Sequence, residues 1–193
     1  MNIILASGSP RRREILTMAG IPFTVVTSDI EEQVPPGLSV EETVMSLARQ
    51  KAEAVFKDHP GCCVIGADTV VYLDGEILGK PHTPENAAAF LSRMQGRQHS
   101  VYTGLVVLTD KGADVRFDRT EVTFAPMTRE EIEWYVSTGE PLDKAGAYGV
   151  QGPAGLFVQK IEGVYFNVVG LPLPLLYVML KDAGVLKCGP VPV

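Results

Sequence analysis

The turn between the first strand and the first helix constrains the fold most. Residues 3–5 form an apolar run that predicts a buried strand. Residues 7–10 follow directly and open a helix, because Ser9 is a good N-cap and Pro10 stands where proline is favoured at the first helical position. Such a helix start presents free backbone N–H groups at the positive end of the helix dipole, so the sequence predicts an anion-binding site here.

Three arginines, Arg11, Arg12 and Arg13, occupy the first turn of that helix. Their charge opposes the helix dipole and costs local stability unless an anion lies between them and the helix. We therefore interpret the turn as a site for phosphate or polyphosphate. The alternative is a basic turn exposed to solvent. This interpretation is more plausible for Arg13 than for Arg11 and Arg12.

Composition and charge narrow the class of protein. The chain has 193 residues, of which 46% are apolar and 21% charged, as in soluble globular proteins with one large domain or two small lobes. Its formal net charge of −6 argues against nucleic acid as a partner. No apolar run reaches membrane-spanning length, and the arginines at 11–13 follow the first apolar run, which reverses the order of a signal peptide. We expect a cytoplasmic protein with no membrane partner, whose three cysteines lack zinc-type spacing and are reduced.

Hydrophobic patterns and turn signals predict an α/β protein around a mixed, twisted sheet, and not a strictly alternating Rossmann fold. Strands are expected at residues 3–7, 22–28, 62–73, 76–78, 99–109, 114–125, 156–161 and 164–169. Helices are expected at residues 10–19, 40–57, 84–94, 128–138 and 172–183. No linker or repeat divides the chain, and residues 189–193, with two prolines, are expected to form a loose tail.

Lys51 is the second feature that points to a site. A capping-box pattern at residues 39–42 opens its helix, whose inward stripe contains Val44, Leu47, Ala48 and Val55 on either side of Lys51. A lysine in an apolar stripe commonly extends its ammonium past the edge of the core. The alternative is that the stripe faces a cleft in which the ammonium meets a phosphate. The spacing leaves both interpretations open.

Asp68 interrupts the apolar run at residues 64–71, so it is expected on a central strand. A carboxylate there is costly unless it binds a metal, pairs with a cation or accepts hydrogen bonds. A structural salt bridge would explain Asp68 alone, but not the return of Lys80 on the hairpin partner strand. Together with the arginine turn, these residues predict a charged cleft for a metal–phosphate complex, with Glu31 as a further carboxylate for the cation.

Residues 143–152 form a glycine-rich loop whose Gln151 is both a hydrogen-bond donor and an acceptor. From this stretch alone, a structural loop is the favoured interpretation. The sequence has no serine-nucleophile elbow and no Walker-type phosphate loop, and His59, His82 and His99 stand in no recognisable catalytic setting. A mechanism with a serine or cysteine nucleophile therefore has little support.

Taken together, these motifs resemble the Maf family of nucleotide pyrophosphatases. The matching segments are residues 5–12, Glu31 and residues 48–52, 66–71, 79–81, 139–149, 151–152 and 169–172, in family order over nearly the whole chain. The resemblance implies one domain over residues 1–193, with an elongated two-lobed α/β fold and a central cleft, similar to that of inosine triphosphate pyrophosphatases of the Ham1 type. It also implies metal-dependent hydrolysis of a nucleoside triphosphate to the monophosphate and pyrophosphate.

The resemblance assigns roles to individual residues as well. Asp68 matches the family's general base, and Asp68 with Glu31 would hold Mg²⁺ or Mn²⁺ as the cofactor. The implied substrate-binding residues are Ser7, Ser9, Arg11, Arg12, Lys51, Thr69, Lys80 and Gln151. Of these, Arg11, Thr69 and Gln151 match positions that select the base, whereas Arg12, Lys51 and Lys80 match those that bind the triphosphate.

Gln151 also indicates the subgroup, because relatives that act on 7-methyl-GTP carry glutamate at its position. The implied substrates are dTTP and UTP, with CTP or modified pyrimidine nucleotides as further candidates, in a house-cleaning or cell-division-linked role. Two alternatives come from other classes: a non-catalytic nucleotide-sensing regulator of septum formation, and a nucleic-acid-binding regulator. A catalytic carboxylate beside a phosphate site weighs against the first, and the acidic net charge against the second. The sequence leaves the oligomeric state open, with a homodimer among the alternatives.

Overall fold

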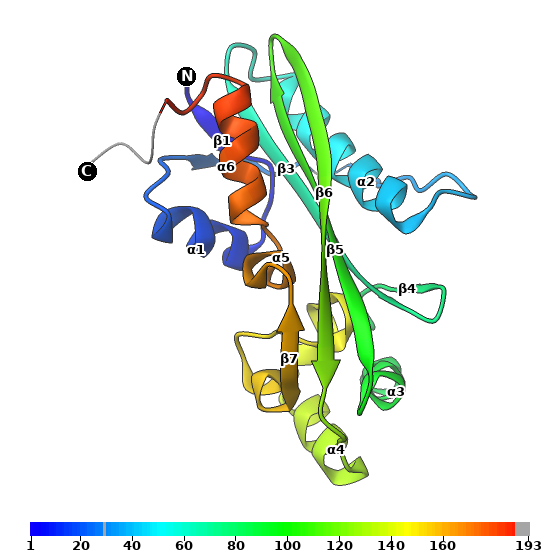
Figure 1. The fold of residues 1–193 in the computed structure, drawn as a ribbon. Coiled ribbons are helices and arrows are strands. Elements are labelled where there is room, and N and C mark those ends of the chain that lie inside the picture. Colours follow the sequence, from blue (N-terminus) through cyan, green and yellow to red (C-terminus); the bar gives the residue numbers. More distant parts are fainter. Residues whose placement is uncertain (29, 188–193) are drawn as a thin grey trace. The chain divides into compact units, whose positions relative to one another are not determined.

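A computed structural model describes residues 1–28 and 30–187 and shows a mixed α/β protein (Figure 1). The strands are β1 (Ile3–Leu5), β2 (Thr24–Val25), β3 (Cys63–Leu73), β4 (Glu76–Leu78), β5 (Gln98–Thr109), β6 (Gly112–Phe124) and β7 (Val158–Glu162). The helices are α1 (Pro10–Met18), α2 (Val40–Phe56), α3 (Pro84–Met94), α4 (Arg129–Ser137), α5 (Tyr165–Val169) and α6 (Leu173–Asp182), with 3₁₀ helices η1 (Glu140–Asp143), η2 (Ala145–Ala147) and η3 (Pro153–Phe157). The tail expected at residues 189–193 lies outside the described residues.

One sheet contains both parallel and antiparallel strand pairs. Its strand order is β2-β1-β3-β5-β6-β7, and β4 pairs with β3 off this path. β1 runs parallel to both β2 and β3, whereas β4 is antiparallel to β3 and β7 is antiparallel to β6. The predicted mixed sheet is therefore confirmed, and the hairpins distinguish it from a strictly alternating Rossmann fold.

The chain divides into two compact units. The first unit comprises residues 1–28, 30–68, 103–118 and 170–187, and the second comprises residues 69–102 and 119–169. β3, β5 and β6 contribute residues to both units. The single domain expected over residues 1–193 stays a prediction. Within the described residues, no helix has the length and apolar character needed to cross a membrane.

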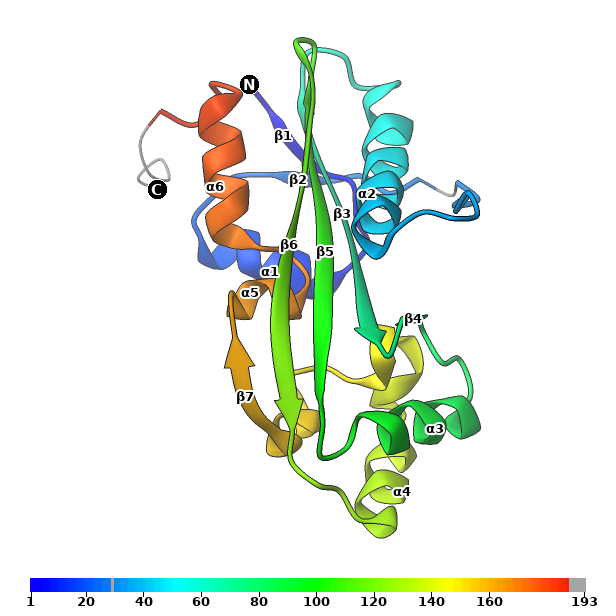
Figure 2. The ribbon, with the colours of Figure 1, turned by 45° about the vertical axis from the view of Figure 1, so that its right-hand side comes forward.

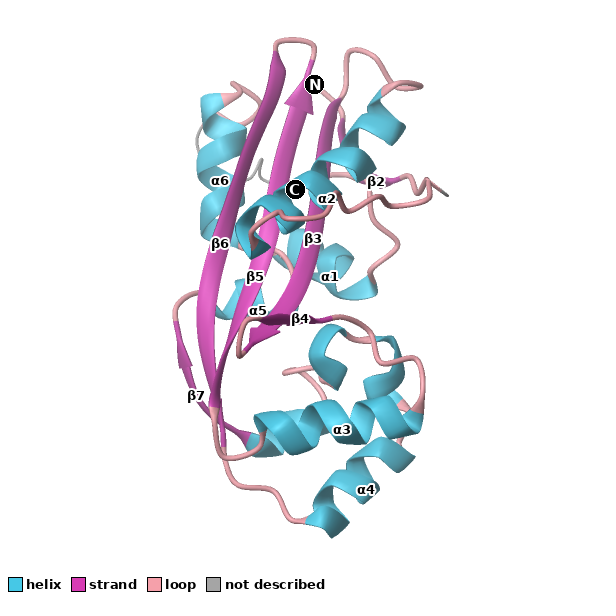
Figure 3. Ribbon diagram, turned by 90° about the vertical axis from the view of Figure 1, so that its right-hand side faces the viewer, coloured by secondary structure: helices cyan, strands magenta, loops and turns pink. Residues whose placement is uncertain are grey.

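In the first unit, helices cover both faces of the sheet. α2 lies on one face, while α1 and α6 lie on the opposite face (Figures 2 and 3). The α2 side is an apolar cluster in which Ala48, Ala52 and Val55 of the helix pack against Val64 of β3 and Val106 of β5. The stripe predicted for this helix is thus the face that packs on the sheet.

Two glycines let α2 approach the sheet closely. A Cβ atom added at Gly66 would lie 2.3 Å from the backbone oxygen of Ala48, and one added at Gly104 would lie 2.1 Å from that of Val44. Real Cβ atoms do not approach backbone oxygens so closely, so any side chain at these positions would push the helix away. Glycine at these two positions on β3 and β5 therefore sets the distance between helix and sheet.

The second unit has its own apolar core. α3 and α4 pack against each other (Figure 3). Leu91 and Met94 of α3, Ile132 and Tyr135 of α4, and Phe124 of β6 are buried in one cluster. Both helices begin as their caps predict: the Thr83 side chain accepts a hydrogen bond at the start of α3, and a complete capping box opens α4.

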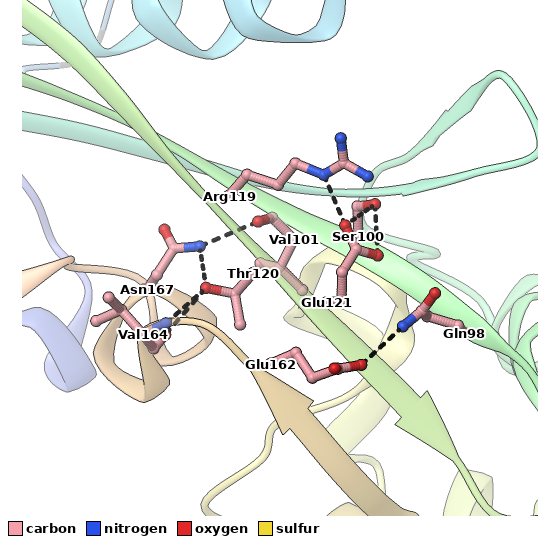
Figure 4. Close-up of polar contacts among 9 residues, drawn as sticks. All are labelled: Gln98, Ser100, Val101, Arg119, Thr120, Glu121, Glu162, Val164 and Asn167. Atoms are coloured by element: carbon pink, nitrogen blue, oxygen red, sulfur yellow. Dashed lines mark hydrogen bonds and ion pairs between the residues drawn. The ribbon is translucent and has the colours of Figure 1, made fainter.

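The strand predicted at residues 164–169 is wrong, because this segment forms the short helix α5. Its β-branched and aromatic residues favour a strand on composition alone. The Asn167 side chain, which is fully buried, instead donates hydrogen bonds to the backbone oxygen of Val101 and to Oγ1 of Thr120, both at 3.0 Å (Figure 4). The Thr120 hydroxyl also bonds both backbone groups of Val164 at 3.1 Å. These contacts with β5 and β6 decide the conformation, and local propensity does not.

Two smaller predictions are also corrected. β2 spans two residues where a strand over residues 22–28 was expected. The loop expected at residues 143–152 begins at the last residue of η1, contains all of η2 and ends just before η3. The remaining elements agree with the predicted ones apart from small shifts at their ends, where helices fray and strands lose pairing.

Candidate active site

The predicted anion-binding turn joins β1 to α1. Ser9 occupies the N-cap with extended backbone dihedrals, but within the described residues its side chain makes no capping hydrogen bond. The Ser7 hydroxyl organises the turn instead, accepting hydrogen bonds from the backbone N–H of Ser9 at 3.2 Å and from Nη1 of Arg12 at 3.0 Å. The turn therefore holds a guanidinium at a helix N-terminus, which is an arrangement that favours an anion.

Arg12 is the buried cation of this turn. Its side chain is buried, and its Nε donates to the backbone oxygen of Gly170 at 2.7 Å. Burial lowers the pKa of Arg12, while the nearby carboxylates of Asp68 and Glu32 oppose that effect. Arg13 is exposed, so a solvated basic turn describes Arg13 but not Arg12. A buried arginine without a bulk-solvent shell binds an arriving anion more strongly than a surface arginine does.

Lys51 joins two carboxylates. Its Nζ lies 2.5 Å from Oδ1 of Asp68 and 3.1 Å from Oε1 of Glu32. The side chains of Lys51 and Asp68 are 20% and 13% exposed, whereas that of Glu32 is 42% exposed. The lysine does not extend past the core into solvent. It holds its charge at the point where two acidic side chains meet.

The sequence analysis chose Glu31 for the cation, which stays a prediction, and did not predict the contact that Glu32 makes with Lys51. Both glutamates are exposed, and Glu32 is the one whose carboxylate reaches Lys51. The side-chain amide of Gln50 aligns this loop with α2, because it donates to the backbone oxygen of Gln33 at 2.8 Å and accepts from the backbone N–H of Gln33 at 3.0 Å. Residue 33 thus faces residue 50, and residue 32 faces residue 51. No periodicity in the loop sequence distinguishes two adjacent glutamates.

The carboxylates of Asp68 and Glu32 are the oxygen donors available to the divalent metal that the resemblance implies. Among the described residues, no group of three or more histidine, cysteine, aspartate or glutamate side chains gathers as in a site built by protein alone. Asp68 and Glu32 do converge on one cation, the Lys51 ammonium. Mg²⁺ commonly uses one or two carboxylates and completes its shell with substrate phosphates and water. Two carboxylates beside an anion-binding turn fit that pattern.

Three of the predicted site residues belong to the second unit. Thr69 follows Asp68 directly on β3 and is half-buried, whereas Lys80 and Gln151 are exposed. Gln151 lies in a turn that the backbone N–H of Gly152 closes on the oxygen of Gly149 at 3.1 Å. The gathering of these three residues with those of the first unit stays a prediction.

Within the second unit, the structure ties the glycine-rich loop to the segment around Lys80. The backbone N–H of Gly146 donates to the oxygen of Gly79 at 3.0 Å, and that of His82 donates to the oxygen of Leu142 at 3.2 Å. Lys80 stands between these two anchors. The loop that carries Gln151 and the segment that carries Lys80 are therefore connected by backbone hydrogen bonds, although the sequence places them some 60–70 residues apart.

The fold and the site define a class: α/β proteins that bring carboxylates and cations together in the unit that also holds a helix start of the kind that favours anions. Comparison with solved structures supports the fold: the Staphylococcus aureus Ham1 protein superposes with a TM-score of 0.53 and 18% identity, covering 95% of this chain and 100% of that one. The family is narrower than the fold. The model of the Maf-like protein family matches residues 2–183, and this chain belongs to that family.

Curated relatives support the same assignment. A dTTP/UTP pyrophosphatase of Bacillus mycoides (strain KBAB4) is 49% identical over 180 residues, which cover 93% of this chain and 94% of the relative. A dTTP/UTP pyrophosphatase of Bacillus velezensis is 48% identical over 183 residues, which cover 95% and 97%. The family predicted from the motifs is thus confirmed.

Proposed function

We propose that this protein hydrolyses dTTP and UTP to the nucleoside monophosphate and pyrophosphate. The observation that carries the proposal is the meeting of Asp68, Glu32 and Lys51 in the unit that also holds the buried Arg12. The names of relatives nearly 50% identical over almost the whole chain support the reaction and the two substrates. CTP and modified pyrimidine nucleotides are further candidates, and action in the cytoplasm stays a prediction.

Binding of the triphosphate is the first task of the site. Arg12 is held by Gly170 and Ser7, so its guanidinium needs little reorganisation when an anion arrives. Lys51 pairs with two carboxylates, and the oxygens of a triphosphate would offer its ammonium new partners. Lys80 would add a further cation toward the phosphates. Together these groups would stabilise the charge that develops on pyrophosphate as it leaves.

Asp68 is the proposed general base. Once Lys51 turns to the phosphates, the Asp68 carboxylate would accept a proton from the attacking water, whose oxygen forms the new bond to the α-phosphorus as the bond to pyrophosphate breaks. A divalent cation, Mg²⁺ or Mn²⁺, held by Asp68 with Glu32 or Glu31, would neutralise phosphate charge and orient the substrate. A carboxylate bound to a cation is a weaker base, so the two roles of Asp68 are alternatives.

Gln151 is the proposed reader of the base, and Arg11 and Thr69 are further candidates for base selection. Its amide oxygen can accept from N3–H of uracil or thymine while its NH₂ group donates to a ring carbonyl oxygen. An ionised glutamate can only accept, and it would face those carbonyl oxygens with its own lone pairs. An amide at this position therefore suits a pyrimidine with one N–H between two carbonyl groups.

The first prediction tests the reaction with a panel of nucleotides assayed for pyrophosphate release. UTP and dTTP should give the monophosphate and pyrophosphate, and removal of divalent cations with EDTA should stop turnover. Asp68→Asn should lower kcat by roughly 100- to 10,000-fold, because general-base catalysis contributes about that much. The matched control is Asp58→Asn, an exposed aspartate of the same unit, which should keep wild-type kinetics.

Two outcomes would contradict the proposal. Near-normal turnover by a folded Asp68→Asn variant would show that Asp68 is structural. Tight binding of UTP without release of pyrophosphate would favour the nucleotide-sensing alternative.

A further inference from the structure

The turn that carries Gln151 rests on a buried tyrosine. The backbone N–H of Gly149 donates to the hydroxyl oxygen of Tyr135 at 3.3 Å, and Tyr135 on α4 is fully buried. Burial and the nearby Glu140 carboxylate raise the pKa of Tyr135, so its hydroxyl stays protonated and donates a hydrogen bond to Glu140. A chain of contacts thus leads from Glu140 through Tyr135 to the start of the turn.

Glu140 also touches the turn directly. A Cβ atom added at Gly152 would lie 2.0 Å from Oε1 of Glu140, and one added at Gly149 would lie 3.0 Å from the same oxygen. The two glycines therefore pack against one carboxylate oxygen, and Gln151 stands between them. Any side chain at Gly152 would displace either the carboxylate or the turn.

This carboxylate is a poor choice for stability alone. Oε2 of Glu140 is buried and has no hydrogen-bond partner among the described residues. Lys144 donates to the backbone oxygen of Glu140 and to Asp143, and no bond from its ammonium to the Glu140 carboxylate is formed in the described structure. Burying a carboxylate oxygen without a partner costs free energy. What Glu140 supplies in return is the shape of the turn.

We propose that Glu140 is a positioning residue for base recognition: it holds residues 149–152, directly and through Tyr135, so that the Gln151 amide faces the pyrimidine. The inference rests on the proposed function, in which Gln151 reads the base. Gln151 itself is exposed, so the support under its backbone decides where its amide points. Glu140 acts on the reaction through Gln151 and touches no phosphate.

A double-mutant cycle with UTP as substrate tests the coupling. Glu140→Ala should lower kcat/KM by roughly 10- to 100-fold, mainly through KM, because a small misplacement of a binding group can cost that much. Gln151→Ala should lower it as well. The double variant should be no worse than Gln151→Ala alone, since the support has no further role once the amide is gone. Glu140→Gln, which keeps the shape and an acceptor for Tyr135, should restore most of the loss.

Two controls separate positioning from general stability. Glu131→Ala removes the capping-box carboxylate of α4 and should lower the melting temperature while kcat/KM of the folded enzyme stays unchanged. Hydrogen exchange of the Gly149 and Gly152 amides should quicken in Glu140→Ala with no nucleotide present. If Glu140→Ala does not fold, Tyr135→Phe takes its place in this experiment. This variant keeps the ring and removes the hydroxyl, so exchange at the two glycines should quicken in the same way.

Different results would overturn the positioning role of Glu140 and the proposed hydrolytic function. Losses that multiply in the double variant, or unchanged exchange at both glycines, would overturn the role of Glu140. An unchanged kcat/KM for UTP in Gln151→Ala, with turnover abolished in Asp68→Asn, would remove base reading from this turn and leave the hydrolytic function standing. That result would overturn the positioning role too.

Discussion

At the scale of single residues, charge balance shapes the first unit's site. Asp68 and Glu32 bring two negative charges, and Lys51 and Arg12 bring two positive charges. Groups this close and only partly exposed depend on one another, because removal of one partner leaves an uncompensated charge in a poorly solvated place. In the proposed function, the same balance would let the cluster accept a triphosphate together with a divalent cation, since the two bring opposite charges.

Lys51→Met tests this dependence. If Lys51 had no partner, its replacement by methionine would leave the melting temperature unchanged or raise it. Its contacts with Asp68 and Glu32 reverse that expectation, and the variant should lose stability by less than the roughly 3–5 kcal/mol typical of a broken, fully buried pair. It should also lose most UTP hydrolysis. Urea unfolding and pyrophosphate release would measure both effects.

The exposed Lys57, just after α2, gives a matched control. Lys57→Met should change neither stability nor turnover. If Lys51→Met behaves like this control, Lys51 is an ordinary lysine at the edge of a core.

Residue types and their order in the sequence indicated several candidate site residues. The contacts that these residues make with one another could not be predicted from the sequence. Asp68 stood out because a charge on an apolar strand demands an explanation. The choice of Glu32 over Glu31 depends on the hydrogen bonds between Gln50 and Gln33, which join a loop to a helix and leave no local pattern. The role of Glu140 was not predicted for the same reason, since its contacts are with α4 and with a later turn.

At the scale of elements, the separation between α2 and the sheet matters most. Gly66 lies two residues before Asp68 on β3, and Ala48 lies almost one turn before Lys51 on α2. Contact between Gly66 and the backbone of Ala48 therefore also sets how closely the ammonium approaches the carboxylate. The distance between α2 and the sheet therefore affects both the packing of the core and the contact between Lys51 and Asp68.

Gly66→Ala should consequently affect both. Its new Cβ would overlap the backbone oxygen of Ala48, so α2 must shift, at a cost of about 1–3 kcal/mol for an overpacked core. The shift should separate Lys51 from Asp68 and lower kcat as well. Gly79→Ala, where a Cβ would meet open space, provides the stability control. A Gly66→Ala variant with wild-type urea midpoint and kcat would show that α2 adjusts freely.

Elements with local signals were predicted well, and those set by distant contacts were not. The capping boxes that open α2 and α4 involve residues three apart, so the sequence displays them directly. α5 takes its conformation from the buried Asn167 amide and its partners on β5 and β6. A window of six residues contains none of those partners, so it indicated a strand.

At the scale of the whole molecule, one buried histidine links stability to pH. His99 is 2% exposed, its Nε2 lies 2.8 Å from the hydroxyl of Tyr148, and its ring packs edge-on against Phe124. Burial lowers the pKa of His99 to about 4, well below the ordinary value of 6.5. His99 is therefore neutral in the folded protein across the range in which an unfolded chain would protonate it.

Acid should destabilise the protein through this residue. Between pH 6.5 and about 4 the unfolded chain binds one more proton than the folded chain at this position, so stability should fall as pH is lowered through that window. The slope contributed by one proton is about 1.4 kcal/mol per pH unit at most. Urea unfolding from pH 7 to 4 would measure it, and His99→Phe should flatten the curve. An equal slope in both proteins would assign the acid sensitivity to other groups.

The motif order along the chain predicted the family correctly, because each motif is local and their sequence is rarely met by chance. The assembly of the first unit from residues 1–68, 103–118 and 170–187 was beyond that approach. No local sequence pattern indicates that α1 and α6 pack on the same sheet. Only packing of the complete chain brings these segments together.

The bond between Arg12 and Gly170 joins residues 158 positions apart, and it has a consequence for the order of events during synthesis. The arginine turn leaves the ribosome early, yet its guanidinium acquires this partner only after residue 170 has emerged. Until then the nascent chain carries a basic turn without one of the contacts that hold Arg12 in place. A chain truncated before residue 170 lacks this partner for Arg12 and should therefore bind nucleotides poorly.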